Sequence, residues 1–327
     1  MATIIHRRPA RSVRPTPPRG PGGTFWSLTR VGWLFAALGA AWLAWSLRFL
    51  LDLGDPVQWS WAAVLQQALT ALRGAAVVAM PAALELGVPA ARRRTPWLYR
   101  GLVLLAIEQL ARPILSQLQQ LAFENLGADS LQPSLDQPIS LVLVLLSLAV
   151  TLLAVAGTWS LSDGLADAGA RPRRSVLGGV VAAGAALSAF VYVPGYGFFT
   201  EGAAIDPTSL AMWINVISIV LGLVEIALWI AVAVRLIYGG ATRRLRPKEA
   251  WLYGAIAGLF LLVIRIVYPV VLLAKLEGDA LAAVLTTVAA GPWIFLFIAF
   301  VAGLGRGRER REERPRPARL FIRNPTG

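Results

Sequence analysis

The sequence predicts an all-α protein, a polytopic membrane bundle of eight transmembrane helices arranged as two parallel four-helix repeats. Three observations lead to this fold class. Long apolar runs recur along the chain, and the segments between them alternate in charge. The loops of the two halves also share short sequence motifs at the same spacing, which we call loop landmarks. Hydrophobic residues make up 57% of the 327 residues, and the mean hydropathy is +0.63. Such a composition is more apolar than that of ordinary soluble domains.

The apolar runs are each about 20 residues or longer, which is enough for a helix to cross a hydrocarbon core of roughly 30 Å. A backbone in lipid must satisfy its own hydrogen bonds, so we expect these runs to be helices. The predicted spans are residues 31–53, 59–86, 98–120, 139–160, 176–194, 209–237, 250–274 and 281–304.

The segments between the spans alternate in charge. The basic segments carry Arg7, Arg8, Arg11, Arg14 and Arg19, then Arg92, Arg93 and Arg94, then Arg171, Arg173 and Arg174, then Arg243, Arg244, Arg246 and Lys248, and then the tail from Arg306. The intervening segments carry Asp55, then Glu124, Asp129 and Asp136, then Glu201 and Asp206, then Glu277 and Asp279. Because positive residues mark the cytoplasmic side, we expect both termini to be cytoplasmic.

The net charge of +13 comes from tails and short loops beside the spans. That distribution fits topology and contact with anionic lipid headgroups, and it disfavours nucleic acid as a partner. Two basic segments, 1–29 and 305–327, are predicted to be disordered cytoplasmic tails. Arg heavily outnumbers Lys, a composition typical of GC-rich bacterial genomes. We therefore expect a multi-pass protein of the bacterial cytoplasmic (inner) membrane.

The internal repeat is carried by loop landmarks. Asp55-Pro56 is followed by Arg92-Arg93 after 37 positions, and Asp206-Pro207 is followed by Arg243-Arg244 after the same 37. We predict a first membrane repeat at 30–161, a linker at 162–174 and a second repeat at 175–304. Four spans per copy is an even number, so the copies are parallel. Chance similarity, or convergent use of helix-start and interface signals, is the alternative explanation.

Small residues at a spacing of four occur in span 176–194, where Gly184 precedes Ser188. Such residues let helix backbones approach closely. We therefore expect spans 31–53 and 176–194 to lie near the seam between the repeats, with ordinary packing elsewhere in the bundle as the alternative.

Five ionisable residues fall near the centres of spans, where each costs about 2.5–3.5 kcal/mol. Such groups must face the protein interior or water and need partners. Glu108 and Arg112 are one helical turn apart and can pair directly. One Arg is left over, and it needs a backbone carbonyl, a solute or a partner chain. The predicted midplane polar site consists of Arg73, Glu108, Arg112, Glu225, Arg265 and Tyr268.

In repeat register, opposite charges occupy nearly equivalent places, because Arg73 aligns beside Glu225 and the Glu108–Arg112 pair aligns near Arg265. We therefore hypothesise a charge network across the pseudo-twofold axis. The alternatives are that these charges serve packing specificity alone or catalysis.

Several chemistries are excluded by residue content. The chain has no Cys, and its one His, His6, lies in the predicted N-terminal tail. The membrane region therefore offers no nucleophilic Ser-His or Cys-His pair and no metal or haem site built on His, and we expect no cofactor. The glycines of span 176–194 lack the Lys-Ser/Thr of a phosphate-binding loop.

The sequence favours a permease-like transporter or channel for a small solute or ion, working through the polar site between the two repeats. Three midplane Arg against two Glu favour an anionic solute. Two alternatives stay open: a non-catalytic membrane subunit or scaffold of a larger complex, and a lipid-modifying membrane enzyme. Expected partners are the bilayer, a small solute or ion, and a membrane or ATPase subunit that would supply energy.

Overall fold

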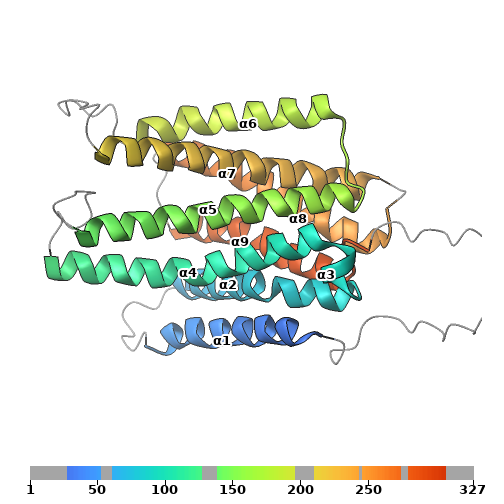
Figure 1. Ribbon diagram of the computed structural model, residues 1–327, viewed down its shortest axis with the longest axis horizontal. Coiled ribbons are helices and arrows are strands. Elements are labelled where there is room, and N and C mark those ends of the chain that lie inside the picture. Colours follow the sequence, from blue (N-terminus) through green and yellow to red (C-terminus); the bar gives the residue numbers. More distant parts are fainter. Residues whose placement is uncertain are drawn as a thin grey trace, which may run out of the picture.

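The computed structural model describes residues 28–52, 61–126, 138–195, 210–242, 245–273 and 279–306. Most of both predicted tails and the landmarks Asp55, Asp206 and Arg243-Arg244 lie outside the described residues. The regular elements of the described part are all α-helices, so the predicted all-α class is confirmed (Figure 1). They are α1 (Arg30–Asp52), α2 (Trp61–Gly87), α3 (Ala91–Arg94), α4 (Pro96–Leu126), α5 (Pro138–Asp167), α6 (Arg174–Gly195), α7 (Leu210–Ala241), α8 (Lys248–Leu273) and α9 (Asp279–Val301).

Six helices of the described chain are long and apolar enough to cross a membrane: α1, α2, α4, α5, α7 and α9. Helix α6 falls short, because its described apolar part ends at Phe190, and α8 is not among the six. The predicted count of eight spans is therefore not confirmed. Helix α5 also continues to Asp167, six residues into the predicted linker 162–174.

The helices pack in an order that closes on itself. Helix α2 packs against α4, α4 against α5, α5 against α7, α7 against α8, α8 against α9, and α9 against α2. Helix α1 lies outside this ring against α2, and α6 lies outside it against α7 and α8, at opposite edges of the molecule (Figure 1). The two halves of the sequence therefore meet through α2 with α9 and through α5 with α7.

The expectation that spans 31–53 and 176–194 lie near the seam was wrong, because α1 and α6 each pack within their own half of the sequence. The small residues of α6 do not all mark a packed face. Gly178 and Gly179 have open space beside them, whereas Gly184 lies against Ile230 of α7. Small-residue spacing alone does not say which face of a helix has a neighbour.

The end of the bundle that holds α3, the start of α6 and Arg306 is called the basic end here. The half of the bundle next to this end is tightly packed. Its core includes fully buried Met80, Leu98, Trp251 and Phe300. Gly87 at the end of α2 lies close to the backbone of Phe300 in α9 and of Gly303 in the turn that follows, so any side chain would collide with it.

Polar contacts also join the helices at the basic end. Glu85 is buried, and Thr29 donates to its carboxylate from the backbone N–H at 2.9 Å and from the hydroxyl at 2.8 Å. Arg92 pairs with the same carboxylate, with Nε 3.5 Å from Oε1. Arg306 Nε donates to the carbonyl oxygen of Gly87 at 2.7 Å. These contacts connect the residue before α1 and the segment after α9 to α2.

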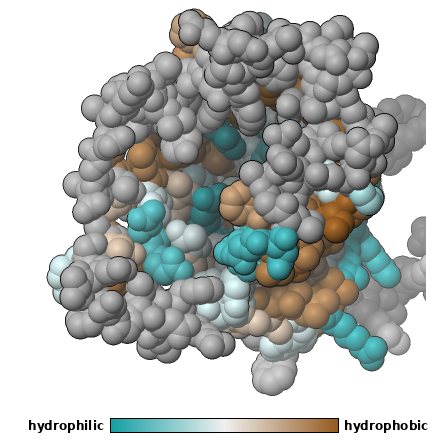
Figure 2. Space-filling model, turned by 90° about the vertical axis from the view of Figure 1, so that its left-hand side faces the viewer, coloured by the Kyte–Doolittle hydropathy of each residue, from teal (hydrophilic) through white to brown (hydrophobic). Residues whose placement is uncertain are grey.

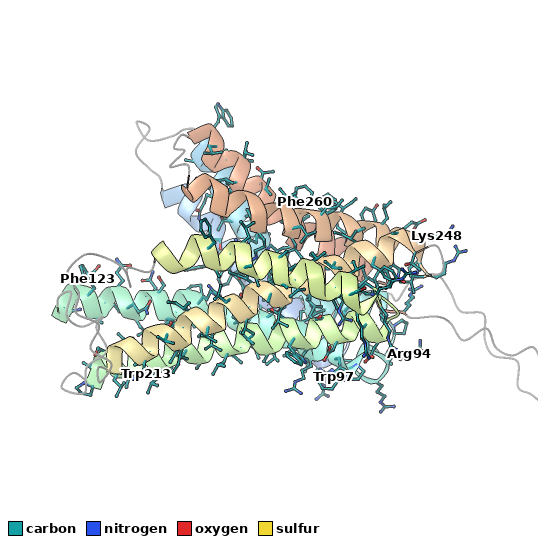
Figure 3. The ribbon with its side chains drawn as sticks, turned by 90° about the horizontal axis from the view of Figure 1, so that it is seen from above. Arg94, Trp97, Phe123, Trp213, Lys248 and Phe260 are labelled. Carbon is teal, nitrogen blue, oxygen red and sulfur yellow. The ribbon has the colours of Figure 1, made fainter. Side chains whose placement is uncertain are left out.

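Toward the opposite end the helices spread apart. Figure 3 shows α8 and α9 diverging from α4 and α5 between the end labelled by Arg94 and Lys248 and the end labelled by Phe123 and Trp213. Among the described residues of this half, a small buried apolar cluster joins α4 to α5 through Leu115, Ala122 and Leu143. The bundle is therefore closed at its basic end and wider at the other. We call the tightly packed half the basic half and the other the wide half.

Candidate functional site

A cavity of about 820 Å³ lies inside the wide half of the bundle. Its lining comes from α1, α2, α4, α5, α7, α8 and α9. Figure 2 faces the end opposite the basic end, and it shows the surface hollowed there, with hydrophilic residues inside the hollow. A volume of this size is within the roughly 300–1,000 Å³ typical of small-molecule sites.

The five ionisable residues that the sequence places near span centres all line this one cavity: Arg73, Glu108, Arg112, Glu225 and Arg265. They come from α2, α4, α7 and α8, so residues far apart in the sequence share one space. The side chain of Tyr268, the sixth predicted residue, lies outside the described residues. A shared cavity spares these charges from facing lipid, which is the costly arrangement.

Glu108 and Arg112 form the ion pair that their spacing predicts, with Arg112 Nε donating to Glu108 Oε1. Glu108 is only 7% exposed, whereas the Arg112 side chain is 56% exposed. Helical geometry explains the pairing, because residues four apart lie on one face. Glu108 is thus fixed in the wall, and Arg112 reaches toward open space.

Two tryptophans form the deep end of the cavity. Trp229 of α7 and Trp293 of α9 pack edge to face, with ring centroids 5.0 Å apart and an interplanar angle of 83°. The guanidinium of Arg73 lies 5.8 Å from the Trp293 ring centroid, within cation–π range. Trp229 Nε1 donates to Glu225 Oε1 at 3.3 Å. The aromatic pair thereby positions one cation and one anion at the cavity floor.

Below this floor the bundle is sealed. Val77, Leu105 and Trp229 line the cavity and also belong to the main apolar core of the basic half. The core continues toward the basic end through residues such as Leu102 and Leu236, which are fully buried. The cavity is therefore a dead-end pocket in this conformation.

The wall on the α1 side is made by Trp42, Trp45 and Ser46. Gly74 of α2 leaves the space that the Trp42 indole occupies, so α1 can lie close to α2 with this large ring between them. Gln67 Nε2 donates to the Ser46 carbonyl at 3.5 Å, which adds a polar link between the same two helices.

Three Arg and two Glu give the described lining a net charge of +1 when all are ionised. Gln67, Thr70 and Gln109 add neutral polar groups. Among the residues that the structure describes, there is no cluster of His, Asp and Glu suited to hold a metal ion. Guanidinium groups are donors with fixed forked geometry that match carboxylate and phosphate oxygens. The lining is chemically suited to an anion with an apolar or aromatic portion.

The sequence prediction missed Trp42, Trp45 and Trp293 as cavity residues, and it missed Glu85 as a buried charge. Tryptophan is usually placed at the membrane interface, yet Trp42 and Trp45 are three residues apart and fall on one face of a helix. That spacing could have indicated that the two α1 tryptophans face the same space. Glu85 is near the end of its span, where a carboxylate is expected to be solvated.

The fold and this cavity define a helical protein of the multi-pass membrane class with a polar pocket enclosed by its helices. Comparisons with known protein families, with curated proteins and with solved structures find no match for this chain.

Proposed function

We propose that this protein resides in the bacterial cytoplasmic membrane, binds a small anionic solute in the central cavity, and moves it across the membrane. The observation that carries the proposal is the meeting of all five midplane charges in one cavity with an excess of positive charge. A net positive charge at membrane depth is costly, since each charged residue there costs about 2.5–3.5 kcal/mol. An anionic solute would offset that cost when it binds.

The distribution of charge supports an orientation with the basic end in the cytoplasm. Arg92, Arg173, Arg246 and Arg306 all belong to the basic end in the described structure, and Glu124 lies near the opposite end. Positive residues on inner loops are the general rule for membrane proteins. The cavity would then face the outer side, and the dense core of the basic half would separate the solute from the cytoplasm.

We further propose that the helices form two parallel repeats, in which α1, α2, α4 and α5 correspond to α6, α7, α8 and α9. The packing supports this, because the contacts between successive long helices in the first half have counterparts in the second half. Contacts of α1 with α2, α2 with α4, and α4 with α5 match those of α6 with α7, α7 with α8, and α8 with α9. The seam contact of α2 with α9 matches that of α7 with α5.

This arrangement suits alternating access, in which one repeat rocks against the other around a fixed site. Both seams line the cavity, since α2, α9, α5 and α7 all contribute to it. Helices α2, α4 and α9 contain Pro81, Pro113 and Pro292, where a missing backbone hydrogen bond permits bending. A second state would open the basic half and close the wide half.

The chain's lack of Cys gives a direct test, because a single introduced thiol is then the only one in the protein. Gly222 lines the cavity and has open space where a side chain would go. We expect Gly222→Cys to react with the anionic methanethiosulfonate MTSES faster than with cationic MTSET, each rate being normalised to that of a free thiol. The expected ratio is about tenfold, at the low end of electrostatic focusing.

The matched control is Ala83→Cys on α2, because Ala83 is buried in the basic half and should stay unreactive. An unreactive Gly222→Cys in folded protein would mean a dry, paired network and would favour the scaffold alternative. A reactive thiol that prefers the cationic reagent would contradict an anionic solute.

A further inference from the structure

A second, apolar groove of about 460 Å³ lies beside the cavity, between α1 and α4. Leu38 of α1 and Leu110, Pro113 and Ile114 of α4 line it. Ile114 is 63% exposed. In the proposed membrane orientation this groove faces the acyl chains of the bilayer.

The groove and the polar cavity share a wall. Trp42 and Trp45 line both spaces, and their rings pack edge to face with centroids 5.7 Å apart. On α4 the change from polar to apolar lining occurs between neighbouring residues. Gln109 and Arg112 line the cavity, and the residues directly after them, Leu110 and Pro113, line the groove. A single ligand could therefore contact both surfaces across the two tryptophans.

Helix packing leaves this flank open. In the described chain α1 packs along α2 and makes at most a weak contact with α4. At the corresponding place in the second half, α6 does pack against α8. Trp45, which stands between groove and cavity, is 47% exposed. The α1–α4 flank is thus the side from which a bilayer component can reach the charged cavity.

From this geometry we infer that the ligand is an anionic amphiphile, with its anionic headgroup in the cavity near Arg73 and Arg112 and its alkyl chain in the α1–α4 groove. Excess positive charge in the cavity selects the headgroup, and the apolar lining of the adjoining groove selects the chain. The inference rests on the proposed function, since it specifies which kind of anion the cavity takes. It also gives Trp42 and Trp45 a role, as the aromatic boundary at which head and chain meet.

The test compares n-decyl phosphate with inorganic phosphate, which carries a similar head without a chain. Binding is measured by titration calorimetry on the full chain in nanodiscs of zwitterionic lipid, with empty nanodiscs subtracted. n-Decylphosphocholine serves as the probe with a chain but no net charge. We expect n-decyl phosphate to bind at least about tenfold more tightly than either other probe, because only it uses both surfaces.

The matched variants are Ile114→Trp, which fills the groove, and Leu152→Trp, which places the same bulk at an exposed site on α5. Ile114→Trp should reduce the affinity ratio of n-decyl phosphate to phosphate from about tenfold to about one, and Leu152→Trp should preserve it. Two results would overturn the proposal that the ligand is an amphiphile and leave the anion site intact. One is equal affinity of the two phosphates in the unmodified protein, and the other is an affinity ratio that Ile114→Trp does not change. Absence of binding by both phosphates would overturn the anion site as well.

Discussion

The two halves of the bundle are built from the same helices but packed in opposite ways. In the basic half, backbones touch at glycines such as Gly87, and large side chains such as Trp251 and Phe300 are fully buried. In the wide half, the same helices stand apart around a cavity that contains five charges. Tight packing and the charged cavity are therefore separated along the helix axis, so each half should respond differently to the same kind of substitution.

The largest expected contrast is between two tryptophans. Replacing Trp251 with Ala should lower the free energy of unfolding by about 3–5 kcal/mol, because a large buried side chain is lost from the core. Replacing Trp45 with Ala should cost less than about 1 kcal/mol, since its ring is half exposed in the wide half. Unfolding of the two variants in SDS titrations from mild micelles measures the difference. Equal losses would remove the distinction between the halves.

A smaller contrast is expected between two glycines. Gly87→Ala should cost about 1–3 kcal/mol, because the new methyl group meets the α9 backbone. Gly222→Ala should stabilise the protein by about 0.5–1 kcal/mol, since it adds helix propensity at a position with open space. The same SDS titrations test both changes. A Gly87→Ala variant with unchanged stability would show that α2 and α9 can move apart at the basic end with little cost in free energy.

Charge substitutions in the cavity should change the ratio of the reaction rates with MTSES and MTSET by roughly tenfold, which corresponds to about 1.4 kcal/mol. In the Gly222→Cys background, Arg73→Gln should weaken the preference for the anionic reagent, because it removes the net positive charge. Glu225→Gln should strengthen that preference, because it removes a negative charge from the cavity and replaces the carboxylate that accepts from Trp229 Nε1. Reaction rates with the two reagents measure both effects. Shifts in the same direction would contradict an electrostatic origin.

The smallest contrast concerns two threonines. Thr29→Ala should cost about 1 kcal/mol, because its hydroxyl donates to Glu85 and accepts from the N–H of Gly32 at the start of α1. Thr70→Ala should be near neutral, because the Thr70 hydroxyl donates only within its own helix, to the carbonyl of Gln66. Thermal melting of the two variants provides the comparison. A neutral Thr29→Ala would mean that the Glu85 contacts do not hold α1.

Part of this organisation is predictable from sequence. Charges at span centres must avoid lipid, so the meeting of Glu108, Arg112 and Arg265 in one space follows from their positions and the cost of exposure. Helical spacing also predicts the Glu108–Arg112 pair. The helices themselves follow from apolar length, although the structure identifies six of the eight predicted spans as long and apolar enough.

Other features depend on three-dimensional packing that local patterns do not encode. Gly178 and Gly179 look like a contact face but have open space, whereas Gly87 and Gly101 are pressed against neighbouring backbones. Which glycine meets a partner is decided by the path of another helix. The sequence does show where the bundle narrows, because many of the closely packed glycines of the ring helices lie toward the basic end: Gly87, Gly101, Gly157, Gly164, Gly239, Gly240 and Gly258.

Whether the cavity opens only at the end opposite the basic end is measured by the sidedness of thiol access at Gly222→Cys. Membrane-impermeant MTSES is added to right-side-out and to inside-out vesicles containing this variant, and the modified fraction is followed over time. A cavity open opposite the basic end and sealed at it predicts rapid modification in right-side-out vesicles and slow modification in inside-out vesicles. Equal rates from both sides, or access only from the cytoplasmic face, would contradict it.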